Sequence, residues 1–222
     1  MTVRHRGALA AMAAGVAALT VATVVACGSQ PAGDVGADEA AALASSSPPS
    51  PTTGTGGAPS VPVTAGDLPT GERTVPPVKL RIPAIDVTAT VNPVGVDTRT
   101  DEFDVPPSVD QIGWYRYGPG LETAAGSVVI AGHVDSSEQG KGAFFRLREL
   151  DRGDTVTATG ADGKQSAYRV VAREEYAKTK IPLDRYFARD GKPRLTLITC
   201  GGPFDPKTRH YRDNIVVTAV PA

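Results

Sequence analysis

A cysteine in the C-terminal part of the sequence is the strongest candidate for chemistry. Cys200 ends the apolar, β-prone run 194–200 and is followed by Gly201 and Gly202. A thiol at the end of a strand can face a groove, and glycines beside it leave backbone N–H groups accessible to a developing oxyanion. The alternative is a buried free cysteine that acts as a small apolar side chain.

A histidine occupies a comparable position. His133 follows the apolar run 127–132 and could reach a thiol on a neighbouring strand. Cysteine needs such a partner because its free pKa of about 8.5 leaves only a few per cent thiolate at neutral pH. The alternative is a surface histidine or a hydrogen-bonded core histidine, and His210 is the rival for the catalytic role. Asp135, two residues further on, is either an orienting group for His133 or a surface carboxylate.

An arginine stands ten residues before the end of the sequence. Arg212 lies in the string HYRDN, which leads into the apolar run 214–220. A guanidinium keeps its charge and offers five donors in a planar fork, which suits a carbonyl that turns into an oxyanion. The alternative is an ordinary arginine paired with a surface carboxylate.

Short β-prone runs separated by turns must position these residues. Residues 161–164 (ADGK) predict a hairpin turn, and residues 143–150 predict one short helix with Phe144, Leu147 and Leu150 on one face. No long amphipathic helix and no regular strand–helix alternation is present. This pattern favours a mostly-β protein with a closed or nearly closed barrel over a doubly wound α/β sheet. The expected strands are 78–82, 85–91, 127–132, 154–160, 166–172, 194–200 and 214–220.

Four strings in this region together resemble one family. VVIAGHVDS, LTLITCGGPFD and HYRDNIVV occur in the order and at the spacing of the sortase family of cysteine transpeptidases, and LRIPAIDVTATV resembles the first strands of that family. The resemblance covers residues 78–222. The two glycines after Cys200 and the YRDN string are most similar to the actinobacterial class F branch, with class E next.

The resemblance implies a sortase-type β-barrel with Cys200, His133 and Arg212 in one groove. Cys200 would attack the Thr–Gly amide of a C-terminal L-P-x-T-G-like sorting signal on another secreted protein. The thioacyl-enzyme would then pass its acyl group to an amine of a cell-wall precursor or a pilin lysine, or slowly to water. His133 would act as general acid and base, and Arg212 would bind the substrate carbonyl and its oxyanion. The resemblance implies no metal and no other cofactor.

The segment 174–193 falls where the family keeps a substrate-groove loop. Four of its residues are candidates for a pocket that takes the Leu-Pro part of the signal, and the alternative for them is core packing. They are Ile181, Pro182, Leu183 and Tyr186.

The N-terminus reads as an export signal. A short basic region, Arg4-His5-Arg6, precedes the uncharged apolar stretch 7–26, and small residues stand directly before Cys27. The pattern resembles a bacterial lipoprotein signal in which Cys27 is lipidated. The alternative is an uncleaved anchor, since twenty apolar residues can just span a bilayer. Both readings place the rest of the chain on the outer face of the cytoplasmic membrane or in the cell wall. A disulfide between Cys27 and Cys200 is the third option.

Residues 27–75 are rich in Gly, Ala, Ser, Thr and Pro, and the first aromatic side chain of the sequence is Phe103. Such a segment buries too little apolar surface to offset its ordering entropy, so it predicts a disordered tether. The sequence thus divides into a signal or anchor (1–26), a tether (27–75) and a catalytic domain (76–222).

Charge and cysteine content exclude other classes. Residues 76–222 contain 20 basic and 19 acidic side chains, which argues against a nucleic-acid-binding protein. Two cysteines cannot form a disulfide framework or a four-thiolate metal site. Three alternatives stay open: a non-enzymatic surface lipoprotein or binding module whose sortase-like barrel carries an inert thiol, an ordinary cysteine peptidase, and a metal site. The ligands of that site would be Cys200, His133, His210 and Asp135.

Overall fold

The computed structural model describes residues 33–45, 74–97, 99 and 102–222. The chain divides into two compact units, Met1–Gln30 and Pro31–Ala222, and all described residues belong to the second. The predicted signal or anchor segment, Cys27 and the larger part of the predicted tether lie outside the described residues. No helix within the described ranges is long and apolar enough to cross a membrane.

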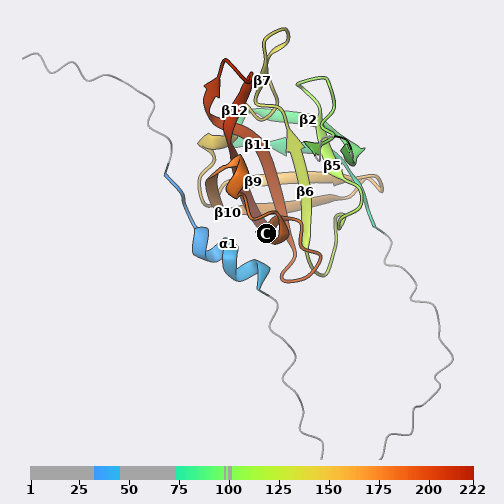
Figure 1. Cartoon of the computed structure of the whole chain (residues 1–222). Helices are drawn as coiled ribbons and strands as arrows, with labels where there is room; N and C mark the ends of the chain where they lie inside the picture. The colour runs from blue at the N-terminus through green and yellow to red at the C-terminus, as the bar shows by residue number, and fades with distance from the viewer. Residues whose placement is uncertain (1–32, 46–73, 98, 100–101) are drawn as a thin grey trace, which may run out of the picture. The chain divides into compact units, whose positions relative to one another are not determined.

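Eight strands close into a barrel in the order β1-β2-β5-β6-β11-β12-β10-β9 (Figure 1). Neighbouring strands are antiparallel except for the pairs β2–β5 and β6–β11, which are parallel. The closed, mostly-β barrel expected from the sequence is therefore confirmed. The barrel strands are β1 (Pro77–Ile82), β2 (Val87–Val94), β5 (Ile112–Tyr115), β6 (Ser127–Gly132), β9 (Thr155–Gly160), β10 (Gln165–Ala177), β11 (Arg194–Asp205) and β12 (His210–Pro221).

Two small sheets and several short helices complete the described part of the chain. The sheets pair β3 with β4 and β7 with β8. The bounds are β3 (Val96–Asp97), β4 (Glu102–Phe103), β7 (Asp135–Ser136), β8 (Gly140–Lys141), α1 (Ala37–Ala44), α2 (Leu183–Tyr186) and the 3-10 helices η1 (Pro83–Ile85), η2 (Leu147–Glu149) and η3 (Lys178–Lys180).

The seven expected strands correspond to β1, β2, β6, β9, β10, β11 and β12, and the 161–164 turn joins β9 to β10. Gly163 in that turn has a φ of 81°, a backbone angle that residues other than glycine rarely adopt. Strand β5 was not predicted, because a strand of four residues is too short to show an alternating pattern.

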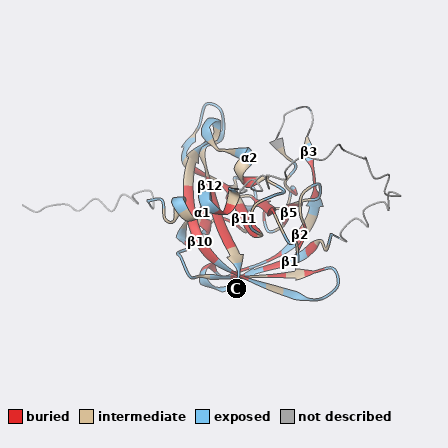
Figure 2. Ribbon diagram, turned by 90° about the horizontal axis from the view of Figure 1, so that it is seen from below, coloured by how far each residue is buried: buried red, intermediate tan, exposed pale blue. Residues whose placement is uncertain are grey.

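Side chains alternate between the inside of the barrel and its outer face, as the strand period of two requires. Figure 2 shows the buried stretches of the strands in red. Leu195 and Leu197 of β11 belong to the main core together with Val128 and Ile130 of β6. The residues between them face outward, yet several are also buried. Outward-facing Thr196, for example, is fully buried and shares a hydrogen bond of 2.7 Å with Ser127.

The predicted helix over 143–150 is wrong in extent, since only η2 is helical there. The first two N–H groups of this stretch bond to other segments: the Ala143 N–H donates to the Val109 carbonyl at 2.7 Å and the Phe144 N–H donates to the His133 carbonyl at 3.2 Å. The predicted apolar face is nevertheless buried, because Phe144, Leu147 and Leu150 all lie in the core.

The predicted disordered tether is wrong for residues 33–45. This stretch contains α1, and Val35 exchanges two backbone hydrogen bonds of 2.8 Å with Arg173 of β10. The composition of the stretch did not reveal this docking, because the backbone makes these bonds.

Buried arginines give the physical reason for this docking. The Arg173 guanidinium donates to the Gly33 carbonyl at 3.2 Å, and the Arg194 guanidinium donates to the Leu43 carbonyl at 3.3 Å. Both arginines are buried and also bond to other groups, and each further acceptor lowers the cost of burying the cation. The carbonyls of the N-terminal segment thus complete the hydrogen bonding of the barrel.

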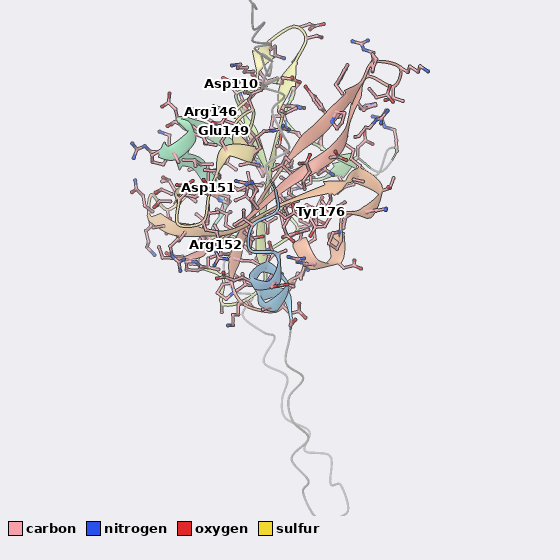
Figure 3. The ribbon with its side chains drawn as sticks, turned by 90° about the vertical axis from the view of Figure 1, so that its left-hand side faces the viewer. Asp110, Arg146, Glu149, Asp151, Arg152 and Tyr176 are labelled. Atoms are coloured by element: carbon pink, nitrogen blue, oxygen red, sulfur yellow. The ribbon has the colours of Figure 1, made fainter. Side chains whose placement is uncertain are left out.

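Side chains add to the attachment of α1. Ala40 and Leu43 are buried. Arg152 lies beside α1 (Figure 3), where its guanidinium forms an ion pair of 2.5 Å with Glu39. Residues 33–45 are therefore part of the folded domain, whose predicted start at residue 76 is too late.

Deleting residues 33–45 is expected to lower the free energy of unfolding by about 2 kcal/mol or more, because two buried guanidinium groups lose acceptors. Urea unfolding of the full chain and of the deletion variant measures the difference. Deletion of residues 49–61 removes the same length of chain and is the control, expected to unfold like the parent. Equal midpoints for all three proteins would show that the N-terminal segment contributes nothing.

Candidate functional site

The parallel pairing of β6 with β11 brings the two principal candidates together. Leu197 pairs with Ile130 and Ile198 with Ala131, and Cys200 and His133 each lie two residues beyond this last pair. These strands lie side by side at the centre of Figure 1. Two side chains that are 67 residues apart in the sequence thus reach the same end of the sheet.

Cys200 projects from the outer face of the barrel. Leu195 and Leu197 point into the core, so the alternation of the strand turns Cys200 the other way. Its thiol is free and partly buried. The Thr199 hydroxyl donates to the Gly132 carbonyl at 2.8 Å, which fastens the end of β6 to β11 beside the thiol.

The two glycines after Cys200 are required by close packing. A Cβ added at Gly201 would lie 2.7 Å from the Ile215 side chain. Gly202 has a φ of 69°, and a Cβ there would meet the Asp213 carboxylate. The strand changes register between Gly201 and Phe204, so the backbone turns away from its partner strand directly after the thiol.

His133 is held through both its backbone and its ring. Its carbonyl accepts the Phe144 N–H, and a Cβ added at Gly142 would lie 2.3 Å from that carbonyl oxygen. The ring Nε2 lies 3.0 Å from the carbonyl oxygen of Pro106. The sequence did not reveal this partner, because the contact is to a backbone atom of a distant loop.

Asp135 is bonded to a tyrosine. The Tyr211 hydroxyl donates to the Asp135 carboxylate at 2.6 Å. This hydrogen bond is the main cause that raises the pKa of Tyr211 to about 12, with burial second, so the hydroxyl stays a donor at neutral pH. The bond ties β7, which follows His133, to the strand that carries Arg212, and these segments lie close together at one end of the barrel (Figure 1). Tyr211 was not singled out from the sequence.

Arg212 lies on β12, near the candidate thiol. Cys200 pairs with Asn214, and Arg212 is two residues away on the same face of the strand. Its guanidinium forms an ion pair of 3.6 Å with Asp205 across the same hairpin, and its side chain is 67% exposed. In this structure Arg212 thus pairs with a carboxylate on β11, the strand that also carries Cys200.

The rival histidine lies further away. His210 is exposed and pairs in register with Asp205, five residues past Cys200 on β11. At about 3.3 Å per residue this separation is at most roughly 17 Å along the strand. The register therefore favours His133 over His210 as the partner of the thiol.

The four candidate groove residues divide into two kinds. Tyr186 is 1% exposed, and its hydroxyl donates to the Glu174 carboxylate at 2.7 Å, so it packs inside the protein and does not line an open groove. Burial is also the main cause that raises the pKa of Tyr186. Leu183 is exposed, and Ile181 and Pro182 are partly buried.

A second cation lies behind the thiol. The Arg148 guanidinium nitrogen Nη2 would be 3.4 Å from a Cβ at Gly201, on the inner side of β11. Burial raises the pKa of Glu175, and the charge of Arg148 acts in the opposite direction on the same carboxyl. Arg148 was not singled out from the sequence, because it is one of several polar residues in the predicted helix.

The metal-site alternative required at least three ligands in one place. Within the ranges that the structure describes, no three His, Cys, Asp or Glu side chains form a group that could hold a metal ion.

Comparison with known families identifies the barrel domain. Residues 80–222 match the sortase domain family. This chain belongs to the sortase family. Comparison with curated proteins gives no match.

Solved sortases share the fold. The chain resembles sortase C-1 from Actinomyces oris, with a TM-score of 0.50 and 21% identity over 65% of this chain and 72% of that one. It resembles a lid mutant of sortase A from Corynebacterium diphtheriae with a TM-score of 0.50 and 22% identity, over 68% and 74% of the two chains. For sortase C1 from Streptococcus agalactiae the TM-score is 0.50 and the identity 18%, over 65% and 66%.

Proposed function

We propose that this sortase is an extracytoplasmic cysteine transpeptidase that acts on C-terminal sorting signals of the L-P-x-T-G type on other secreted proteins. The observation that carries the proposal is the β6–β11 register, because Cys200 and His133 each follow the last pair of these strands by two residues, at the same end of the sheet. Nucleophilic catalysis by cysteine requires a thiol and a base within reach of each other, which this placement supports.

The reaction has two steps. Cys200 Sγ attacks the threonine carbonyl carbon, the Thr–Gly C–N bond breaks, and His133 gives a proton to the leaving glycine amine. The product is a thioacyl-enzyme. An incoming amine then attacks the same carbon, His133 takes its proton, and the C–S bond breaks to return the thiolate. Water in place of the amine gives hydrolysis.

Arg212 would stabilise the oxyanion that forms on the substrate carbonyl. The support is its place on β12, on the face of the strand that carries the partner of Cys200. Its present ion pair with Asp205 is long, at 3.6 Å, and the Arg212 side chain is 67% exposed, so exchange of that carboxylate for a substrate carbonyl costs little.

The substrate's Leu-Pro part would contact the α2 region. Leu183 is 53% exposed, and Ile181 and Pro182, which precede it, are partly buried, so all three side chains are open to a ligand. Tyr186 is left out of this proposal because it is buried.

Class, location and partners follow from the sequence. The GG and YRDN strings favour class F, with class E next. Lipidated Cys27, or an uncleaved segment 7–26, would hold the enzyme on the outer face of the cytoplasmic membrane. Its acceptor would be an amine of a cell-wall precursor or a pilin lysine.

A panel of fluorogenic L-P-x-T-G and L-A-x-T-G peptides, given with and without amines, tests the activity of the full chain. We expect cleavage at Thr–Gly and an amine-bearing product. The Cys200→Ala variant should fold normally and be inactive, because a small residue is tolerated at the outer end of a strand. Turnover by this variant, or a wild-type enzyme silent with every peptide and amine, would overturn the proposal in favour of an inert binding module.

Replacing Arg212 by Lys separates the two readings of this residue. If Arg212 holds the oxyanion, Lys supplies a point charge on a flexible stem in place of a planar fork, and turnover should fall about a hundredfold or more. Stability and thiol alkylation should stay near the parent values. Arg209→Lys, on the same exposed hairpin, is the matched control and should keep full activity. Near-parental turnover of Arg212→Lys would remove Arg212 from the site.

A further inference from the structure

The ring of His133 has one hydrogen-bond partner among the described residues, and this partner determines which nitrogen carries the proton. Nε2 lies 3.0 Å from the Pro106 carbonyl oxygen, and a carbonyl oxygen can only accept. Nε2 must therefore be the donor. A neutral imidazole carries a single N–H, so its Nδ1 is unprotonated.

We propose that the Pro106 carbonyl orients His133 in its Nε2–H tautomer, that Nδ1 exchanges the proton with the reacting groups, and that Gln139 is a positioning residue that holds the Pro106 loop in place. The inference deepens the proposed transpeptidase function and rests on it. It supplies the orienting group for His133 that the sequence did not reveal.

The Pro106 carbonyl is well suited to this role. Pro106 is buried and packs on Gly113 of β5, where an added Cβ would lie 3.2 Å from its Cδ atom. Pro106 and Pro107 both lack an N–H, so this loop cannot donate to a sheet at either residue. Their carbonyls accept hydrogen bonds from side chains instead.

Gln139, in the turn between β7 and β8, forms two hydrogen bonds to the same loop. Its amide nitrogen donates to the Pro107 carbonyl at 3.0 Å, and its amide oxygen accepts the Val109 N–H at 3.2 Å. The Val109 carbonyl in turn accepts the Ala143 N–H at 2.7 Å. The proline loop is thus bonded on both sides to the segment that follows His133.

Asp135, the orienting candidate from the sequence, is hydrogen-bonded to a tyrosine. Asp135 accepts the Tyr211 hydroxyl at 2.6 Å. A backbone carbonyl is a neutral acceptor, so it fixes the tautomer and the ring orientation without adding a negative charge beside the imidazole. The tautomer matters because a histidine with the wrong nitrogen protonated cannot transfer the proton in the required direction.

The tautomer can be read directly by NMR. Long-range ¹H–¹⁵N correlation on the full chain in detergent, labelled with ¹⁵N-histidine, distinguishes a protonated from an unprotonated ring nitrogen. Loss of one signal set in His133→Gln assigns His133. Above the pH at which His133 titrates, we expect hydrogen on Nε2 and none on Nδ1. Hydrogen on Nδ1 would overturn the inference.

Gln139→Ala tests the positioning role, with Gln165→Ala on the exposed start of β10 as the matched control. We expect the Gln139 variant to show a mixture of both tautomers and kcat lowered about tenfold or more, with KM and the unfolding midpoint near the parent values. The control should match the parent in tautomer, kcat, KM and unfolding midpoint. A Gln139 variant with the parental tautomer and kcat would overturn its role.

The two readouts separate the inference from the proposed function. The tautomer spectrum needs no substrate, so it supports or overturns the Pro106 assignment whatever the activity. A parent protein without transfer activity would overturn the function and, with it, the role of Nδ1 in proton exchange.

Discussion

The parallel pairing of β6 with β11 is the constraint on which the candidate site depends. Because both strands run in the same direction, the residues that follow each apolar run emerge at the same end of the sheet. Val128 and Leu197 face the core on these strands, so a shift of one residue in either strand would expose them and bury Cys200 or His133. Burial of the core thus also fixes the position of the thiol relative to the imidazole.

Polar contacts then join the loops at this end of the barrel. The Tyr211–Asp135 hydrogen bond ties the strand of Arg212 to the segment after His133, and the Pro106 carbonyl fixes the imidazole ring. At the side of the barrel, residues 33–45 supply carbonyl acceptors to two buried arginines. Hydrogen bonds to backbone carbonyls recur in these arrangements and set details that the apolar pattern leaves open.

The sequence predicted what side-chain types and alternation determine. The barrel class, seven of its strands and the placement of Cys200 and His133 after apolar runs follow from residues whose pattern is visible in the sequence. The docking of α1, the Pro106 partner of His133 and the place of Arg148 were missed. Each depends on a contact between distant segments, and in the first two the acceptor is a backbone carbonyl, which every residue possesses. The burial of Tyr186 has a similar cause, because its partner Glu174 lies on another element.

The central claim is that Cys200 carries a thioacyl intermediate, and intact-mass spectrometry after rapid quenching tests it most directly. The full chain, mixed with an L-P-x-T-G peptide in the absence of amine, should gain the mass of the acyl fragment that ends in threonine. Proteolytic mapping should place this mass on Cys200, and added amine should remove it. Cleavage of the peptide without such an adduct, or an adduct on another residue, would contradict the account.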